Sequence, residues 1–253
     1  MAKPIYYPHN YVIHPLVIQK QTMPEGWFTY MMNYQKPIPM YIGVFYIAGT
    51  GKHILVDTGG KAETALKRGV GEFTLGAEDV ATPAEALKKV GITPDDIDMV
   101  IMTHLHFDHT EYIKEFKKAK VVVQKAELDF AYNPGLYKGM FAKWMWEGAD
   151  MMVVDGDVEL FPGIWVLFTP GHTAGSQSVL IDTEKGRVII CGLCAIDANF
   201  NPPEVMRKVW QVIPAGIHTN AQEAYNSMVR IKEMADIVVT MHDPKTFEQD
   251  TIP

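Results

Sequence analysis

The segment Thr103-His104-Leu105-His106-Phe107-Asp108-His109 places three of the chain's nine histidines and one aspartate within seven residues. It directly follows the apolar stretch 98–102, which is typical of a short buried strand. Alternate residues of an extended strand end point the same way, so His104 and His106 can converge on one ion. The turn just beyond carries the donors for a second ion, Asp108 and His109. Imidazole and carboxylate groups are preferred ligands of Zn(II) and similar metals, so the segment predicts a metal site.

Two further histidines follow predicted strands in the same way. The loop Thr169-Pro170-Gly171-His172-Thr173 comes after the strand-like stretch 164–168, and His242 comes after the stretch 237–241. Five of the nine histidines therefore lie at three strand ends, where binding sites are usually placed. A solvated turn that happens to hold three histidines would not explain this distribution. We interpret the remaining four as structural, capping or surface residues, namely His9, His14, His53 and His218.

Strand-like and helix-like patterns alternate from end to end of the chain. Two pairs of apolar runs predict hairpins, 41–47 with 53–56 and 178–181 with 188–194. A capping box from Thr82 to Glu85 opens a predicted helix that ends at Gly91, and Asn220 caps another over 221–235. Further strands are expected at 98–102, 120–123, 151–154, 164–168 and 237–241, and further helices at 125–132 and 136–147. This pattern predicts an α/β protein with two mixed sheets packed face to face and helices outside, in a single domain over 1–253.

Composition excludes several classes of protein. The net charge is −7, whereas broad nucleic-acid binding depends on clustered lysine and arginine. The longest apolar run, Val188–Ile196, is far shorter than the roughly 20 residues that a membrane-spanning helix needs. The two cysteines, Cys191 and Cys194, lie in that run and do not resemble a secreted disulfide framework. Prolines and a histidine occupy the N-terminal stretch where a signal peptide has its apolar core. We therefore expect a cytoplasmic protein with no nucleic-acid partner and no membrane partner.

Together these motifs resemble those of the metallo-β-lactamase superfamily and, within it, of the N-acyl homoserine lactonases. The similarity is carried by the 104–109 segment, the loop around His172, the stretch Leu55-Val56-Asp57-Thr58-Gly59 and the pair His242-Asp243, in the family's order. The resemblance implies an αββα sandwich with a two-metal site on one rim. In that site His104, His106 and His172 would hold the first metal, and Asp108, His109 and His242 the second. Asp57 would orient a ligand histidine, although simple turn chemistry would also account for it.

The sequence departs from this family at the residue that should bridge the two metals. Counted without gaps, the position of the bridging aspartate holds Cys194, and the nearest aspartate is Asp197. Three arrangements stay open: the Cys194 thiolate is a ligand, Asp197 reaches back to bridge, or the bridge is missing and one metal binds weakly. Cys194 could also be only a small buried hydrophobe, the role that we assign to Cys191. The family's tyrosine beyond the bridge is absent as well, and Asp197 is the residue that could replace it as a hydrogen-bond donor or an acid.

The resemblance implies a metal-dependent hydrolase that opens a lactone or cleaves a related carboxylic ester. Its cofactors would be two divalent ions, Zn(II) first, with iron, cobalt or manganese as alternatives. A bound ion lowers the pKa of water to about 7 and so supplies hydroxide, while Asp108 would shuttle a proton to the leaving group. The alternatives are a phosphotriester or thioester hydrolase on the same site and a mononuclear iron redox enzyme of the same fold. The intact ligand set argues against a further alternative, a binding module with a dead site.

The apolar, methionine-rich segments 27–32 and 140–146 bear on the partners of the protein. Such clusters line adaptable pockets, but they also line dimer interfaces and ordinary cores. If they line the pocket, the substrate is a small molecule with an apolar portion joined to an ester, a lactone or a thioester. If they lie at an interface, the protein is a homodimer.

Overall fold

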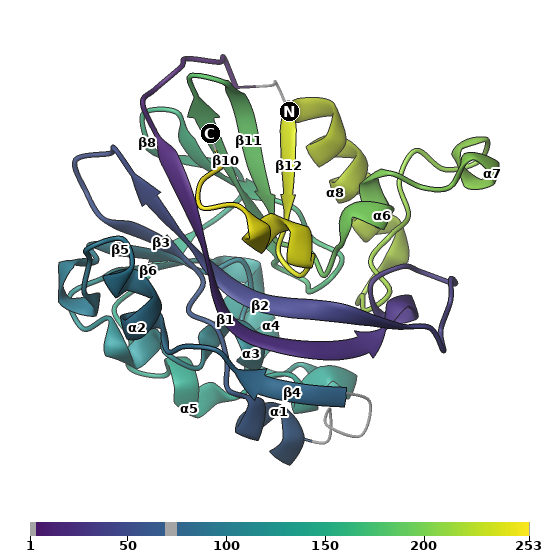
Figure 1. The fold of residues 1–253 in the computed structure, drawn as a ribbon, viewed down its shortest axis with the longest axis horizontal. Helices are drawn as coiled ribbons and strands as arrows, with labels where there is room; N and C mark the ends of the chain where they lie inside the picture. The colour runs from purple at the N-terminus through teal and green to yellow at the C-terminus, as the bar shows by residue number, and fades with distance from the viewer. Residues whose placement is uncertain (1–3, 69–74, 253) are drawn as a thin grey trace.

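Two mixed β-sheets form the centre of the computed structural model, which describes residues 4–68 and 75–252 (Figure 1). The larger sheet has seven strands in the order β4 (Leu75–Asp79), β1 (Val12–Pro24), β2 (Pro37–Ala48), β3 (Ile54–Val56), β5 (Met99–Ile101), β6 (Lys120–Gln124) and β7 (Met151–Val154). The smaller sheet has five strands in the order β12 (Ile237–Thr240), β11 (Gly186–Cys191), β10 (Gln177–Thr183), β9 (Ile164–Phe168) and β8 (Val158–Phe161).

Three apolar layers join the sheets to each other and to the helices. Between the sheets, side chains of both are fully buried, among them Phe45, Ile101, Val179 and Ile190. The outer face of the larger sheet packs against α1 (Ala62–Lys67), α2 (Pro83–Lys88), α3 (Phe107–Thr110), α4 (Lys125–Tyr132) and α5 (Lys143–Trp146). The outer face of the smaller sheet packs against α6 (Asp197–Phe200) and α8 (Ala221–Met234). These layers confirm the predicted αββα sandwich.

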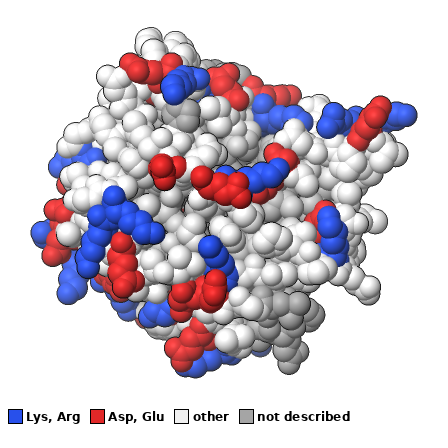
Figure 2. Space-filling view, viewed as in Figure 1, with Lys and Arg blue, Asp and Glu red and all other residues white. Residues whose placement is uncertain are grey.

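The remaining helical segments are short. They are α7 (Glu204–Arg207) and the 3-10 turns η1 (Glu25–Trp27), η2 (Pro94–Asp96), η3 (Ile113–Glu115), η4 (Gly135–Gly139) and η5 (Pro244–Glu248). None of the helices in the described part of the chain is long and apolar enough to cross a membrane. On the face of the molecule shown in Figure 2, basic and acidic side chains lie interspersed.

The predicted capping signals operate as expected. The hydroxyl of Thr82 accepts from the backbone N–H of Glu85 while the Glu85 carboxylate accepts from the Thr82 backbone, so both ends of the capping box are made. The side chain of Asn220 accepts from two backbone N–H groups in the first turn of α8. The helix then buries the apolar stripe that its sequence predicts, Ala224, Met228, Ile231 and Met234.

Three expectations about local structure were wrong or incomplete. The 13-residue strand β1 and the shorter strands β4 and β8 have no counterpart among the predicted elements. The expected helix over 136–147 is divided into η4 and α5, because the backbone around Phe141 pairs with His106 instead of continuing the helix. The expected strand 188–194 ends at Cys191. A side chain on the following residue, Gly192, would lie 1.8 Å from the carbonyl oxygen of Gln177, so only glycine fits where the chain leaves the sheet.

The direction of the strands determines where the polar loops meet. In the larger sheet β3, β5, β6 and β7 run parallel, and in the smaller sheet β11 and β12 run parallel. Because β9 and β11 are both antiparallel to β10, the carboxyl ends of β9 and β12 lie at the same edge. Loops that follow β3, β5, β9 and β12 carry the polar motifs identified in the sequence, and they meet at one rim of the sandwich.

Candidate metal centre

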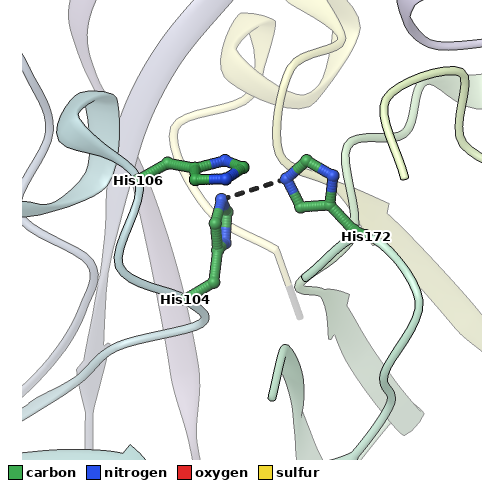
Figure 3. A group of neighbouring side chains, drawn as sticks. All are labelled: His104, His106 and His172. Carbon is green, nitrogen blue, oxygen red and sulfur yellow. Dashed lines mark hydrogen bonds between the residues drawn. The ribbon is translucent and has the colours of Figure 1, made fainter. Parts of the chain in front are cut away.

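The first cluster of predicted ligands consists of His104, His106 and His172. Figure 3 shows their rings pointing toward one another, two from the loop after β5 and one from the loop after β9. One ring nitrogen of each lies within 4.8 Å of one ring nitrogen of the others. All three side chains are buried. Burial lowers the pKa of each ring, that of His172 to about 4, so the imidazoles are neutral at pH 7, the form that binds metal.

The second cluster consists of Asp108, His109 and His242, whose ligand atoms also lie within 4.8 Å of one another. The rings of His104 and His109 are 4.1 Å apart between centroids, so the two clusters are neighbours. Burial would lower the pKa of His109, but the carboxylates of Asp108 and Asp57 raise it to about 10. Two carboxylates on one imidazole make this position attractive to a cation.

Hydrogen bonds at the far side of four rings fix their tautomers. The Nδ1 atom lies 2.7 Å from Asp57 Oδ2 in His109, 2.7 Å from the carbonyl of Ile217 in His172 and 3.1 Å from the carbonyl of Tyr41 in His242. These oxygens can only accept, so Nδ1 carries the proton. The Thr103 hydroxyl donates to Asp57 Oδ2 and therefore accepts from His104 Nδ1 at 3.0 Å. In His104, His172 and His242, Nε2 is left with a free lone pair that faces the cavity, whereas the raised pKa of His109 leaves on its Nε2 a proton that a metal would replace.

This tautomer assignment tests whether the residues fit a metal. The Nε2 atoms of His104 and His172, joined by the dashed line in Figure 3, are 3.2 Å apart. Since both Nδ1 atoms carry a proton and burial keeps both rings neutral, the two facing nitrogens are both acceptors. Two lone pairs at this distance repel each other unless a cation lies between them. In addition, Nε2 of His106 is buried with no hydrogen-bond partner among the described residues. Five imidazoles and one carboxylate thus fit two borderline divalent ions.

Asp57 supports both clusters from behind. Its Oδ1 accepts from the backbone N–H of Thr103 at 2.7 Å, and its Oδ2 accepts from the Thr103 hydroxyl and from His109. The residue is fully buried, and its backbone has φ +59°, a left-handed conformation that aspartate tolerates better than most residues. Asp57 therefore does both things that the sequence suggested: it forms the turn that follows β3, and it contacts His109, a predicted ligand.

Sequence reasoning missed Glu127, a fully buried carboxylate in α4. It accepts from the backbone N–H of Leu105 at 2.8 Å, from the Thr173 hydroxyl at 2.5 Å and from the backbone N–H of Gly175 at 3.1 Å. The loops of His104, His106 and His172 are thereby joined through one side chain. Burial raises the pKa of Glu127 to about 7, although these hydrogen bonds favour the charged form. The α4 backbone at Glu127 also lies against Gly175, where a side chain would lie 1.9 Å from the Glu127 backbone nitrogen.

The two candidates for the bridging position lie in different places. Cys194 is buried and lines the cavity that also contains both clusters, with Sγ 3.9 Å from the carbonyl of Trp27. Burial and the nearby Asp108 raise the pKa of its thiol. Asp197 is exposed at the start of α6, where Oδ1 accepts from Asn201 at 2.7 Å, and it is not among the lining residues. Cys191 is buried and also lies outside the lining.

The rest of the cavity wall is mostly apolar. Two of its residues, Trp27 and Phe28, come from the first methionine-rich segment, and Met140 comes from the second. Other members of the second segment, Met145 and Trp146, are in the core under the larger sheet. The segments therefore serve as pocket wall and as core. The remaining apolar lining is Met23, Met40, Ile42, Ala65, Phe107 and Ile217.

The sequence model of the metallo-beta-lactamase superfamily matches residues 39–242, a range that contains all six predicted ligands. The chain belongs to the metallo-beta-lactamase superfamily. Within this superfamily it is similar to the N-acyl homoserine lactonase of Bacillus cereus, with 32% identity over 191 residues that cover 72% of this chain and 71% of the relative. It is also similar to the N-acyl homoserine lactonase AttM of Rhizobium radiobacter, with 28% identity over 238 residues and 84% of each chain covered.

Solved structures in the superfamily share the fold. A mutant of AiiA from B. thuringiensis with N-decanoyl-L-homoserine bound at its active site matches this chain with a TM-score of 0.74 at 24% identity, over 96% of each chain. AidC, a dizinc quorum-quenching lactonase in complex with its product, matches with a TM-score of 0.64 at 17% identity, over 96% of this chain and 90% of AidC. At these identities the likeness establishes the common αββα sandwich.

Proposed function

We propose that the protein is a dinuclear metal hydrolase that opens N-acyl homoserine lactones or closely related carboxylic esters, with zinc as the first choice of metal. The observation that carries this proposal is the pair of ligand clusters, each with three donors, in one cavity whose remaining wall is mostly apolar. The similarity to curated N-acyl homoserine lactonases supports the choice of substrate. Hydrolysis of N-acyl homoserine lactones is the activity called quorum quenching.

The residues of the chain have distinct roles in such a reaction. Two bound divalent ions would lower the pKa of a water molecule and polarise a carbonyl oxygen. The clusters around His104 and His109 would hold those ions, and Asp57 keeps the His109 ring in the tautomer that presents Nε2. Hydrogen bonding and charge from His109 hold the pKa of Asp108 below its usual range, against the effect of burial. Asp108 is therefore ionised and can accept a proton and return it to the leaving alkoxide.

The substrate side is supported by the wall of the cavity. Aromatic and methionine side chains offer an adaptable apolar surface for an acyl chain. The structures of AiiA and AidC contain N-decanoyl-L-homoserine and N-hexanoyl-L-homoserine, respectively. We infer that this protein accepts a substrate with an apolar acyl portion of the same kind. Cys194 is the better placed of the two candidates for the bridging position, whereas the exposed position of Asp197 gives its predicted bridging and acidic roles no support.

A mononuclear iron redox enzyme of the same fold would use only one cluster. The second cluster would then have no role, although Asp57 and Tyr41 hold its histidines in the orientation of ligands. Elemental analysis separates the two functions, because a hydrolase should contain two zinc, cobalt or manganese ions per chain and the redox enzyme a single iron.

An activity assay tests the proposal directly. The metal-loaded protein should release acid from N-acyl homoserine lactones in a pH-indicator assay, with a rate that depends on the length of the acyl chain. His106→Ala should abolish the reaction, whereas the matched control His14→Ala, outside the cavity, should retain it. A metal-loaded protein that hydrolyses no lactone and no ester would show the proposal to be wrong.

A further inference from the structure

One polar side chain stands out in the apolar part of the cavity wall. Gln21 lies on β1 directly opposite Met40 of β2, and both residues line the cavity. The other lining residues that are neither candidate ligands nor cysteine are aliphatic, aromatic or methionine. Gln21 is only 7% exposed, so its carboxamide is removed from bulk water.

The hydrogen bonds of this carboxamide are incomplete. Its Nε2 lies 2.7 Å from Met40 Sδ, and a thioether is a weak acceptor. Its Oε1 has no hydrogen-bond partner among the described residues. A buried amide in this state destabilises the fold, because its bonds to water are lost and not replaced. Its place in the wall of a cavity suggests that a ligand completes the bonding.

The resemblance to the lactonases implies a tyrosine beyond the bridging position, and this chain does not have one there. The residues after Cys194 include no tyrosine up to Phe200, and Asp197 is exposed outside the cavity. Of the residues that line the cavity outside the two clusters, Gln21 is the one with a carboxamide, which can both donate and accept a hydrogen bond.

We propose that Gln21 is a specificity-determining residue that recognises a secondary amide in the substrate. This inference rests on the proposed function and adds to it the chemical group that the enzyme selects. A secondary amide has one N–H donor for Oε1 and one carbonyl acceptor for Nε2, so the two groups are complementary. Inside an apolar wall these bonds are stronger than in water. A lactone without the amide leaves Gln21 unpaired, and sites of this kind discriminate strongly against the analogue that lacks the polar group.

The test compares two lactones on variants of the metal-loaded protein. The first substrate is N-hexanoyl homoserine lactone, and the second is an alkyl lactone of matched length without an amide. In Gln21→Met, a change of similar volume, we expect kcat/KM for the amide-bearing lactone to fall about tenfold or more, while kcat/KM for the alkyl lactone stays within about twofold. The melting temperature should be maintained or raised, since an unpaired amide is removed. Gln21→Asn, which retracts the carboxamide, should lose the same preference.

Gln19 provides the matched control. It lies two residues earlier on β1, is 1% exposed, and has neither amide atom hydrogen-bonded within the described residues, but it does not line the cavity. Gln19→Met should therefore maintain or raise the melting temperature without changing the ratio of kcat/KM for the two lactones.

Several outcomes would overturn the inference. An equal loss of kcat/KM on both lactones in Gln21→Met indicates a structural role, and unchanged kcat/KM values for both lactones in either Gln21 variant indicate no role. If the wild-type protein hydrolyses neither lactone, the lactonase part of the proposed function fails, and calorimetric binding then decides the inference separately. Wild-type protein should bind N-hexanoylglycine more tightly than octanoate, and Gln21→Met should lose this difference. Equal binding of the two ligands by the wild-type protein would reject the role of Gln21.

Discussion

Oδ2 of Asp57 lies 2.7 Å from Nδ1 of His109, and the same oxygen accepts the hydroxyl of Thr103, which in turn accepts from His104. One carboxylate oxygen therefore orients a histidine of each ligand cluster. An aspartate that is not itself a ligand can in this way determine which ring nitrogens are available to the metals of both clusters.

Replacement of Asp57 by asparagine tests this relationship. Asparagine tolerates the left-handed backbone, but it has one oxygen for three donors, so its amide N–H₂ must face at least one of them. We expect metal affinity to fall about 10- to 100-fold, the usual effect of removing such a support. Metal content after dialysis against a chelator measures this. Asp95→Asn, an exposed change, is the control, and equal metal retention in the two variants would contradict the role of Asp57.

Glu127 should be as important to the metal centre as a metal ligand, although it would not itself contact a metal. One carboxylate oxygen of Glu127 accepts from Thr173 and Gly175, and the other accepts from Leu105. In Glu127→Gln an N–H₂ group replaces one of these oxygens, so at least one donor must face another donor. We expect a lower melting temperature and weaker metal binding, because the loops of both histidine motifs lose their common anchor. Asp129→Asn on the exposed side of the same helix is the matched control. A variant that keeps its melting temperature and its metal would remove Glu127 from the site.

The two cysteines offer a matched pair. If Cys194 is a ligand, cobalt-substituted protein should show a thiolate-to-cobalt charge-transfer band, which Cys194→Ser removes together with part of the bound metal. Cys191→Ser should leave the band unchanged, since Cys191 does not line the cavity. Without a metal the raised pKa keeps the Cys194 thiol protonated, so the thiolate itself would be a sign of coordination. Absence of the band in the wild-type protein would reject Cys194 as a ligand.

The stability of the metal-free protein should depend on pH in both directions. Burial lowers the pKa of His172 and His242 to about 4 from 6.5, so these rings bind protons more readily when the chain is unfolded. Stability should thus be lost as pH falls from about 6.5 to about 4, by about 1–3 kcal/mol for each histidine. His109 acts oppositely: its pKa is raised to about 10, so the stability that it contributes is complete below 6.5 and is lost as pH rises toward 10.

Thermal denaturation of chelator-treated protein measures this profile, in which the melting temperature should fall on the acid side and on the alkaline side. The metal-loaded protein is the control, because a metal on Nε2 of His109 replaces the proton and should abolish the alkaline decline. A melting temperature of the metal-free protein that does not change between pH 4 and pH 9 would show that these rings are not buried as the structure has them.

The two clusters of candidate ligands could be predicted because polar residues at the end of an apolar strand are conspicuous. Strand β1 was missed for the opposite reason, since Gln19 and Gln21 occupy buried positions and Pro15 argues against a central strand. The structure accommodates Pro15 because β4 pairs with β1 only from Gln19 to Thr22, so at Pro15 the strand is paired on the β2 side alone among the described strands.

Long-range contacts account for the other differences. The sequence over 136–147 has helical character, but the carbonyl of Met140 accepts from the backbone N–H of Phe107, and this contact with the ligand loop interrupts the helix. Glu127 has the pattern of an ordinary glutamate in the first turn of a helix, and only its three partners from distant loops reveal its burial. Local sequence does not contain such tertiary effects.

The β1–β2 hairpin contributes Gln21, Met23, Met40 and Ile42 to the cavity but no side chain to either ligand cluster. The hairpin therefore shapes part of the cavity wall without holding a metal. Under the proposed function, mutations in the hairpin should alter the preferred acyl group while the reaction chemistry persists, which makes this ribbon a region for the engineering of new substrate ranges.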